Sequence, residues 1–181
     1  RHTGFWHPMD TMRDRLLLTS DRIKDMARGV RDVVALPDPI GETLAEWTKE
    51  NGLRIRKVRV PLGVVGIIYE SRPNVTVDTA VLALKTGNAI VLRGGKEAAR
   101  SNQCLVEIMA AVPEVPEGAI ELLDSGTRQT VHDLIKARGL VDVIIPRGGA
   151  GLITFVTENS TVPVIETGAG NCHIFVDASA D

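Results

Sequence analysis

The segment Pro61–Lys96 constrains the fold of this 181-residue chain more than any other part of its sequence. Residues 61–69 form an apolar, β-branched run of strand length, which the polar turn Glu70–Asn74 ends. Residues 75–86 have the composition of a helix, a Gly-Asn pair stops it, and residues 89–92 have the character of a short buried strand. A strand, a helix and a second strand joined by short loops predict a parallel sheet covered by helices.

The same alternation of strands and helices continues towards the C-terminus. Further strands are expected at residues 119–123, 141–145, 162–165 and 172–176, with helices at 98–112, 128–137 and 152–158. The sequence therefore predicts an α/β fold with a Rossmann-like, doubly wound, mostly parallel sheet and helices on both faces. In such sheets ligands bind at the carboxyl ends of the strands, where the polar turns of this chain fall.

The N-terminal part follows a different pattern. Residues 1–12 are interpreted as an unrelated or artificial leader, and residues 13–52 are expected to form helices. The second of these helices is predicted over Gly41–Glu50, where an Asn-Gly pair stops it. Residues 53–60 alternate apolar and basic side chains and predict an exposed strand with a bulge. This strand would lie at a sheet edge or a subunit contact, or it is a solvated edge that its charges protect.

The composition excludes several classes of function. A net charge of −2 gives no indication of a nucleic-acid or membrane partner, and the partner expected is a small-molecule substrate. No apolar run approaches the ~20 residues of a membrane span, and no signal peptide is recognisable. Two cysteines do not make a disulfide framework. A cytoplasmic location is therefore expected.

Two cations follow the strand expected at residues 89–92. A site for NAD usually has an acidic residue at such a strand end, which binds the ribose hydroxyls. Arg93 and Lys96 stand there instead and favour the 2′-phosphate of NADP, whose charge they match. The alternative is a solvated basic turn.

A glycine-rich loop lies between the strand expected at 141–145 and the helix expected at 152–158. Its glycines are Gly148, Gly149 and Gly151. Backbone amides in such a loop can bind an anion at the N-terminus of the helix. A tight turn without a ligand fits this pattern equally well.

Three strings carry a resemblance to a known family. They are YESRPNVT at residues 69–76, LRGGKEA at 92–98 and PVIETGAG at 163–170. The chain resembles the gamma-glutamyl phosphate reductase (glutamate-5-semialdehyde dehydrogenase) family of the aldehyde dehydrogenase superfamily over residues 14–181. This resemblance implies NADPH-dependent reduction of L-glutamyl 5-phosphate to L-glutamate 5-semialdehyde, a step of proline biosynthesis.

The resemblance also implies roles for individual residues. Asn74 would donate a hydrogen bond to the developing oxyanion, although it could instead cap the following helix. Arg72 would bind a phosphate or carboxylate of the substrate. Glu166 matches a general base for thioester hydrolysis; a reductase does not need that step, so Glu166 could instead position the cofactor or water. The glycine loop at 148–151 would border the pyrophosphate of NADP(H).

The nucleophilic cysteine of the family lies in a later motif and is absent from this sequence. Cys104 is expected in the buried face of a helix, and Cys172 in a core strand whose pleat turns it away from His173. We therefore expect an NADP-binding domain at 61–162, the start of a catalytic domain at 163–181, and no activity from this chain alone. The parent is expected to be a homo-oligomer. The alternatives are a fragment of another acyl-reducing aldehyde dehydrogenase and a non-catalytic nucleotide-binding or assembly module.

Overall fold

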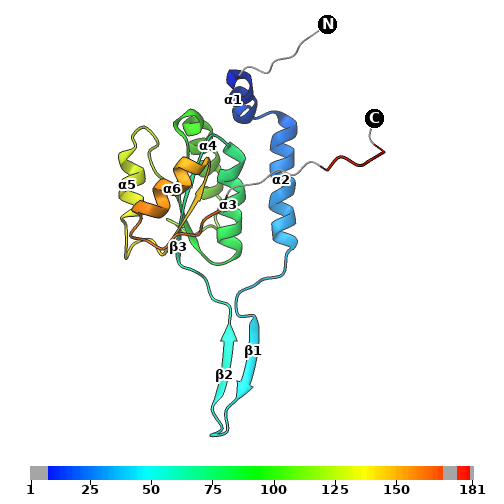
Figure 1. The fold of residues 1–181 in the computed structure, drawn as a ribbon, viewed down its shortest axis with the longest axis vertical. Coiled ribbons are helices and arrows are strands. Elements are labelled where there is room, and N and C mark those ends of the chain that lie inside the picture. Colours follow the sequence, from blue (N-terminus) through cyan, green and yellow to red (C-terminus); the bar gives the residue numbers. More distant parts are fainter. Residues whose placement is uncertain (1–7, 169–174, 180–181) are drawn as a thin grey trace.

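A computed structural model describes residues 8–168 and 175–179, with side chains from Met12 onward (Figure 1). The N-terminal part contains α1 (Pro8–Leu16), α2 (Ser20–Ala35), β1 (Thr43–Thr48) and β2 (Arg54–Val58). The rest contains β3 (Val64–Tyr69), α3 (Pro73–Lys85), β4 (Ala89–Arg93), the 3₁₀ turn η1 (Lys96–Ala98), α4 (Ala99–Ala110), β5 (Ile120–Leu122), α5 (Gln129–Ile135), β6 (Val143–Arg147) and α6 (Ala150–Asn159). No helix of the described part combines the length and hydropathy needed to cross a bilayer.

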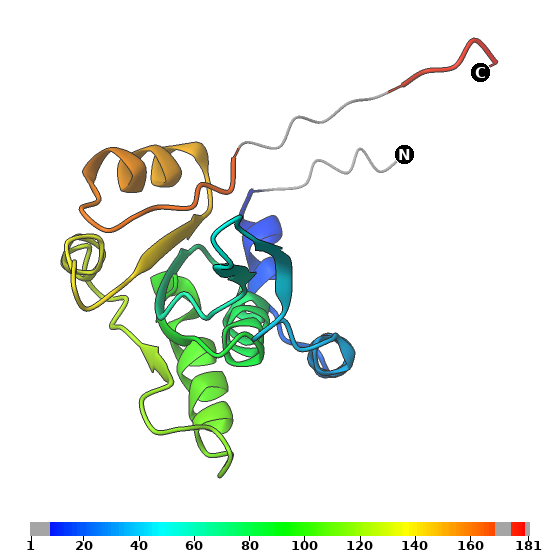
Figure 2. The same ribbon diagram turned by 90° about the horizontal axis from the view of Figure 1, so that it is seen from below.

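Four strands form one parallel sheet in the order β5-β4-β3-β6. Along β3, Val65 and Ile67 pack with α3 and α4 on one face, whereas Ile68 packs with α5 and α6 on the other. Figure 2 shows these two pairs of helices on opposite sides of the sheet. The predicted α/β, doubly wound fold with helices on both faces is confirmed.

The end of the chain contributes less to the sheet than its sequence suggests. Residues 162–165 form a single parallel bridge between Val164 and Ile144 rather than a strand. Pro163 has no N–H group to donate to a longer ladder. The strand expected at 172–176 lies mostly outside the described residues, and Phe175 and Val176 have no regular structure.

The helix predicted over Gly41–Glu50 is wrong. Most of this segment is β1, which pairs antiparallel with β2 in a hairpin that extends away from the sheet (Figure 1). The pair Asn51-Gly52, interpreted as a helix stop, is the hairpin turn, and Gly52 has φ +84°. The exposed strand expected at 53–60 is present as β2, but the break in register falls on β1, between Thr43 and Ala45.

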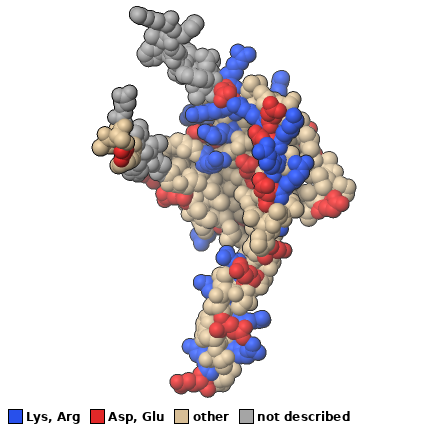
Figure 3. Space-filling view, turned by 90° about the vertical axis from the view of Figure 1, so that its right-hand side faces the viewer, with Lys and Arg blue, Asp and Glu red and all other residues tan. Residues whose placement is uncertain are grey.

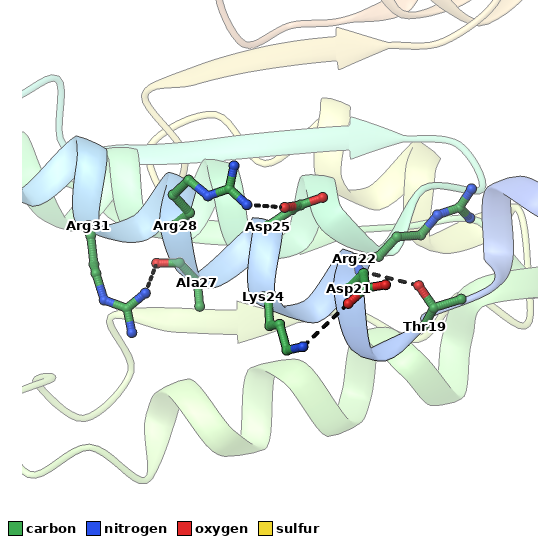
Figure 4. Close-up of polar contacts among 8 residues, drawn as sticks. All are labelled: Thr19, Asp21, Arg22, Lys24, Asp25, Ala27, Arg28 and Arg31. Carbon is green, nitrogen blue, oxygen red and sulfur yellow. Dashed lines mark hydrogen bonds and ion pairs between the residues drawn. The ribbon is translucent and has the colours of Figure 1, made fainter.

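Helix α2 packs on α3 and presents a charged face to solvent. It begins after Thr19, the N-cap residue, whose hydroxyl accepts a hydrogen bond from the amide of Arg22 at 3.2 Å. Along its outer face Asp21 pairs with Lys24, at 3.3 Å, and Asp25 pairs with Arg28 (Figure 4). Figure 3 shows charges of both signs interspersed here, as on a solvated helix surface rather than a site for a polyanion.

Helix α1 begins at Pro8, inside the segment interpreted as a leader. The guanidinium of Arg22 joins α1 to α2, because its Nη2 lies 2.8 Å from Asp14 Oδ1 and its Nη1 donates to the Leu17 carbonyl at 3.0 Å. At the other end of α2, Lys85 Nζ donates to the Val34 carbonyl at 3.2 Å and holds α2 against α3.

Candidate cofactor cleft

A cleft of about 1280 Å³ opens at the carboxyl ends of the parallel strands. The turns after β3, β4 and β6 form its walls, and the loop after β5 closes one side. The chain proceeds from β3 to β4 and β5 in one direction and then places β6 on the other side of β3. The cleft therefore lies where the strand order reverses, which is the usual ligand position in open α/β sheets.

The cleft is rich in positive charge. Among the described side chains, two carboxylates line it, those of Glu70 and Glu97. Its cations are Arg15, Arg72, Arg93, Lys96, Arg128 and Arg147. Six cations against two anions give a wall that attracts an anionic ligand, although the whole chain has a net charge of −2.

Arg93 follows β4 and is half-buried in the wall of the cleft. Its guanidinium donates to the carbonyls of Gly94 at 3.0 Å and Thr127 at 2.9 Å. Burial lowers the pKa of Arg93, and the nearby carboxylates of Asp124 and Glu97 oppose that change. Because its donors are directed at loop carbonyls, Arg93 fixes the loop after β5 and contributes charge to the cleft.

Lys96 is the exposed cation of the same turn. Among residues whose side chains are described, no carboxylate forms an ion pair with it. Its neighbour Glu97 accepts a hydrogen bond from the Ser71 hydroxyl at 3.2 Å instead, which joins the turns after β3 and β4. The ammonium of Lys96 therefore remains available to a phosphate in the cleft.

The glycine loop after β6 carries a carboxylate of the protein itself. Gly149 caps α6, and its amide donates to Oε2 of Glu70 at 3.2 Å. A Cβ atom at Gly148 would lie 2.7 Å from Glu70 Cδ, 2.9 Å from its Cγ and 2.9 Å from Leu152 Cδ2, so a larger residue here would have to move these side chains. Gly151 also lines the cleft and has open space where a Cβ would be.

A buried polar cluster supports the turns of the cleft. The hydroxyls of Tyr69 and Thr76 lie 2.6 Å apart, and Thr76 Oγ1 donates to Asn102 Oδ1 at 3.0 Å. All three side chains are almost fully buried. Gly94 lies directly over them, where a Cβ would be 3.0 Å from Tyr69 Cζ. The cluster thus connects the end of β3, α3 and α4 beneath the turn that carries Arg93 and Lys96.

A family model described as the aldehyde dehydrogenase family matches residues 15–181. The chain belongs to the aldehyde dehydrogenase family. Gamma-glutamyl phosphate reductase from Koribacter versatilis is 73% identical over 171 residues, which are 94% of this chain and 42% of that protein. The protein of that name from Moorella thermoacetica is 61% identical over 93% of this chain and 41% of its own length.

Solved structures of this family share the fold. Gamma-glutamyl phosphate reductase from Thermotoga maritima is 51% identical, with a TM-score of 0.86 over 95% of this chain and 42% of that one. An acetylating aldehyde dehydrogenase from Geobacillus thermoglucosidasius is 27% identical, with a TM-score of 0.61 over 81% of this chain and 31% of that one. The chain therefore spans about two fifths of the length of the reductases it matches.

The structure brings together most of the site residues predicted from the sequence. The cleft collects Arg72, Arg93, Lys96, Gly148, Gly149 and Gly151. Asn74 and Glu166 are not among the residues lining it. Asn74 does not cap α3; its amide nitrogen donates to Asp78 Oδ2 at 3.1 Å, one helical turn further on. Glu166 is exposed beyond the bridge at Val164.

The prediction of a buried Cys104 is wrong, since the side chain is exposed on α4. The buried face of this helix consists of Asn102 and Val106 instead. The other cysteine, Cys172, lies outside the described residues.

The sequence alone did not indicate several residues of the cleft. Met12 and Arg15 of α1 line the cleft, although residues 1–12 were interpreted as a leader and residues 13–52 only as helices. His132 and Phe155 line it as an edge-to-face ring pair with centroids 5.1 Å apart. The loop 125–128 could have been found, because it follows a strand in the same way as the other two turns.

Proposed function

We propose that the complete protein reduces L-glutamyl 5-phosphate to L-glutamate 5-semialdehyde with NADPH, a cytoplasmic step of proline biosynthesis. The observation that carries this proposal is 73% identity, over 94% of this chain, to a gamma-glutamyl phosphate reductase. The cleft supports it, because six cations and a helix N-terminus suit a ligand with several phosphates.

The residues of the cleft fit NADP(H) better than NAD(H). Where β4 ends, a site for NAD would place a carboxylate against the ribose hydroxyls. Here Arg93 strengthens the positive field and Lys96 is exposed, with a charge that matches a 2′-phosphate. Gly149 and Gly151, at the start of α6, would lie near the pyrophosphate. NADPH supplies the hydride when it is bound.

The remaining site residues would act on the substrate. Arg72 lines the cleft and would bind a phosphate or carboxylate group. Asn74 donates one amide hydrogen to Asp78, and its second amide hydrogen is the proposed donor to the developing oxyanion. Glu166 would position water or the cofactor. A cysteine outside the 181 residues would form the thioester and release phosphate.

Residues 61–162 would then be the cofactor domain and 163–181 the start of the catalytic domain. The 181-residue chain alone is expected to bind NADP(H) weakly and to have no reductase activity. Because a two-stranded hairpin is marginal by itself, we propose that β1 and β2 contact another subunit of a homo-oligomer. The half-exposed Trp47 of β1 would lie in that contact.

The test measures the reverse reaction of the complete gene product, in which semialdehyde, NADP⁺ and phosphate give the acyl phosphate and NADPH. We expect turnover that requires phosphate and that is faster with NADP⁺ than with NAD⁺. Lys96→Ala should raise KM for NADP⁺ about 10-fold or more and change KM for NAD⁺ little, since it removes a charge-assisted contact to the 2′-phosphate. Lys24→Ala, on the outer face of α2, is the matched control.

A second candidate is another acyl-reducing aldehyde dehydrogenase. The observation that favours this candidate is the 27% identity to an acetylating aldehyde dehydrogenase. Turnover that requires coenzyme A instead of phosphate would refute the proposed reaction and support this candidate. Oxidation of the semialdehyde without either acceptor would refute both.

A further inference from the structure

The carboxylate of Glu70 lies at the N-terminus of α6, a position in the cleft where one would expect a bound anionic ligand. It follows β3 directly, and its backbone amide lies 3.3 Å from the Arg147 carbonyl at the end of β6. Its carboxylate accepts the amide hydrogen of Gly149, the N-cap of α6, at 3.2 Å. The positive end of α6 therefore already interacts with a negative group of the protein.

The glycine loop packs closely against the side chain of Glu70. Cγ and Cδ of Glu70 fill the space that a Cβ atom would need at Gly148, at 2.9 and 2.7 Å. Gly149, the donor, leaves more room, since a Cβ there would be 3.8 Å from Glu70 Oε1. The contact thus combines a hydrogen bond with close packing across 79 residues of sequence.

The contact is also reversible. Glu70 is exposed to solvent, so its carboxylate can rotate away from the loop without opening the hydrophobic core. Arg72 and Arg147 line the same cleft and offer cations to a displaced carboxylate. A phosphate that reaches the Gly149 amide must first displace Glu70, because two negative groups in contact repel each other.

We propose that Glu70 is an internal placeholder for a phosphate of the cofactor, occupying the N-terminus of α6 until that phosphate displaces it. The inference rests on the proposed cofactor cleft. It assigns Glu70 the role of weakening cofactor binding, whereas the other cleft residues strengthen it. Glu70 thereby sets the affinity for the cofactor. A ligand without a phosphate at this position would leave the contact intact.

The experiment compares Glu70→Gln with wild type in the complete gene product. Kd is measured by calorimetry for NADP⁺ and for inorganic pyrophosphate, at one fixed ionic strength. Glutamine keeps the shape and can still accept from Gly149, but it removes the competing charge. We expect both ligands to bind about 2- to 30-fold more tightly, the range for a charge at a helix N-terminus. The Gly149 amide resonance should shift on mutation and again on adding pyrophosphate.

Two further variants distinguish the effect of where the carboxylate lies from the effect of its negative charge alone. Glu97→Gln removes the other carboxylate of the cleft, which accepts from Ser71 rather than from α6, and should change the Kd for pyrophosphate less than twofold. Glu70→Asp keeps the charge but shortens the reach to Gly149, and should tighten pyrophosphate binding by less than Glu70→Gln does. It also serves if Glu70→Gln fails to fold.

The outcomes are distinct. Unchanged pyrophosphate binding in Glu70→Gln, or an equal gain in Glu97→Gln, would overturn the placeholder. Weaker binding would overturn it too, because Glu70 would then be a ligand of the cofactor. If pyrophosphate responds as expected but no variant binds NADP⁺, the placeholder is supported and the proposed cofactor is refuted.

Discussion

Alkaline titration tests the buried polar cluster through the ionisation of one residue, Tyr69. Tyr69 is the one tyrosine in the 181-residue sequence, so the near-ultraviolet absorbance of tyrosinate belongs to it alone. Its side chain is 2% exposed, and its hydroxyl lies 2.6 Å from Thr76 Oγ1. Burial raises the pKa of Tyr69 from 10.0 to about 12, although the hydrogen bond with Thr76 lowers it.

This change in pKa also predicts how stability depends on pH. The folded protein holds the Tyr69 proton up to about pH 12, whereas the unfolded chain releases it near pH 10. The stabilisation is therefore complete below pH 10 and is lost as the pH rises towards 12. Between 10.0 and about 12 the loss amounts to about 3 kcal/mol of unfolding free energy.

The measurement is a spectrophotometric titration with and without urea, paired with urea unfolding at several pH values. We expect tyrosinate to appear near pH 10 in urea and close to pH 12, or only upon unfolding, without it. Tyr69→Phe should abolish the signal and flatten the loss of stability above pH 10. A folded protein whose tyrosinate midpoint stays near 10 would refute the burial of this hydroxyl.

Three other predictions concern the same part of the molecule. Thr76→Val leaves two buried polar groups without a partner and should lower the unfolding free energy in urea by about 2–4 kcal/mol, against about 1 kcal/mol for Thr76→Ser. Gly94→Ala should cost about 1–3 kcal/mol because its Cβ meets the cluster, whereas Gly151→Ala, in open space on α6, should be neutral or up to about 1 kcal/mol stabilising. Arg93→Met should increase hydrogen exchange in the loop 125–127, where Arg93 binds the carbonyls of Ser125 and Thr127, and equal exchange in both proteins would contradict that role.

The central strands and helices could be predicted because their signals are local. The segment from β3 to β4 contains an apolar run of strand length, a stretch with helix composition and a Gly-Asn helix stop, and the structure follows these local signals. The hairpin was missed for the opposite reason. An Asn-Gly pair ends helices and turns hairpins alike, and residues 41–50 have no buried face to decide between them.

Helix α4 gives a second case in which the sequence did not predict the structure. Cys104 was expected on its buried face, but Cys104 is exposed, and the apolar Ile108 one turn further on is 62% exposed. The face that packs inward carries Asn102, because the partner is the hydroxyl of Thr76 rather than another apolar surface. A hydrophobic stripe therefore could not identify this face from the sequence. Likewise, the contact of Glu70 with Gly149 spans 79 residues and leaves no local signal.

The glycines of the cleft carry different kinds of information. A glycine in a turn at the end of a strand is often explained by the close approach of a ligand. Here a Cβ at Gly94 would clash with the buried polar cluster beneath it, and one at Gly148 would meet the movable ends of the Glu70 and Leu152 side chains. Gly149 and Gly151 have room for a Cβ, so the protein itself does not require glycine there. The evidence for a phosphate therefore rests on the Gly149 amide and the surrounding cations, and not on the number of glycines.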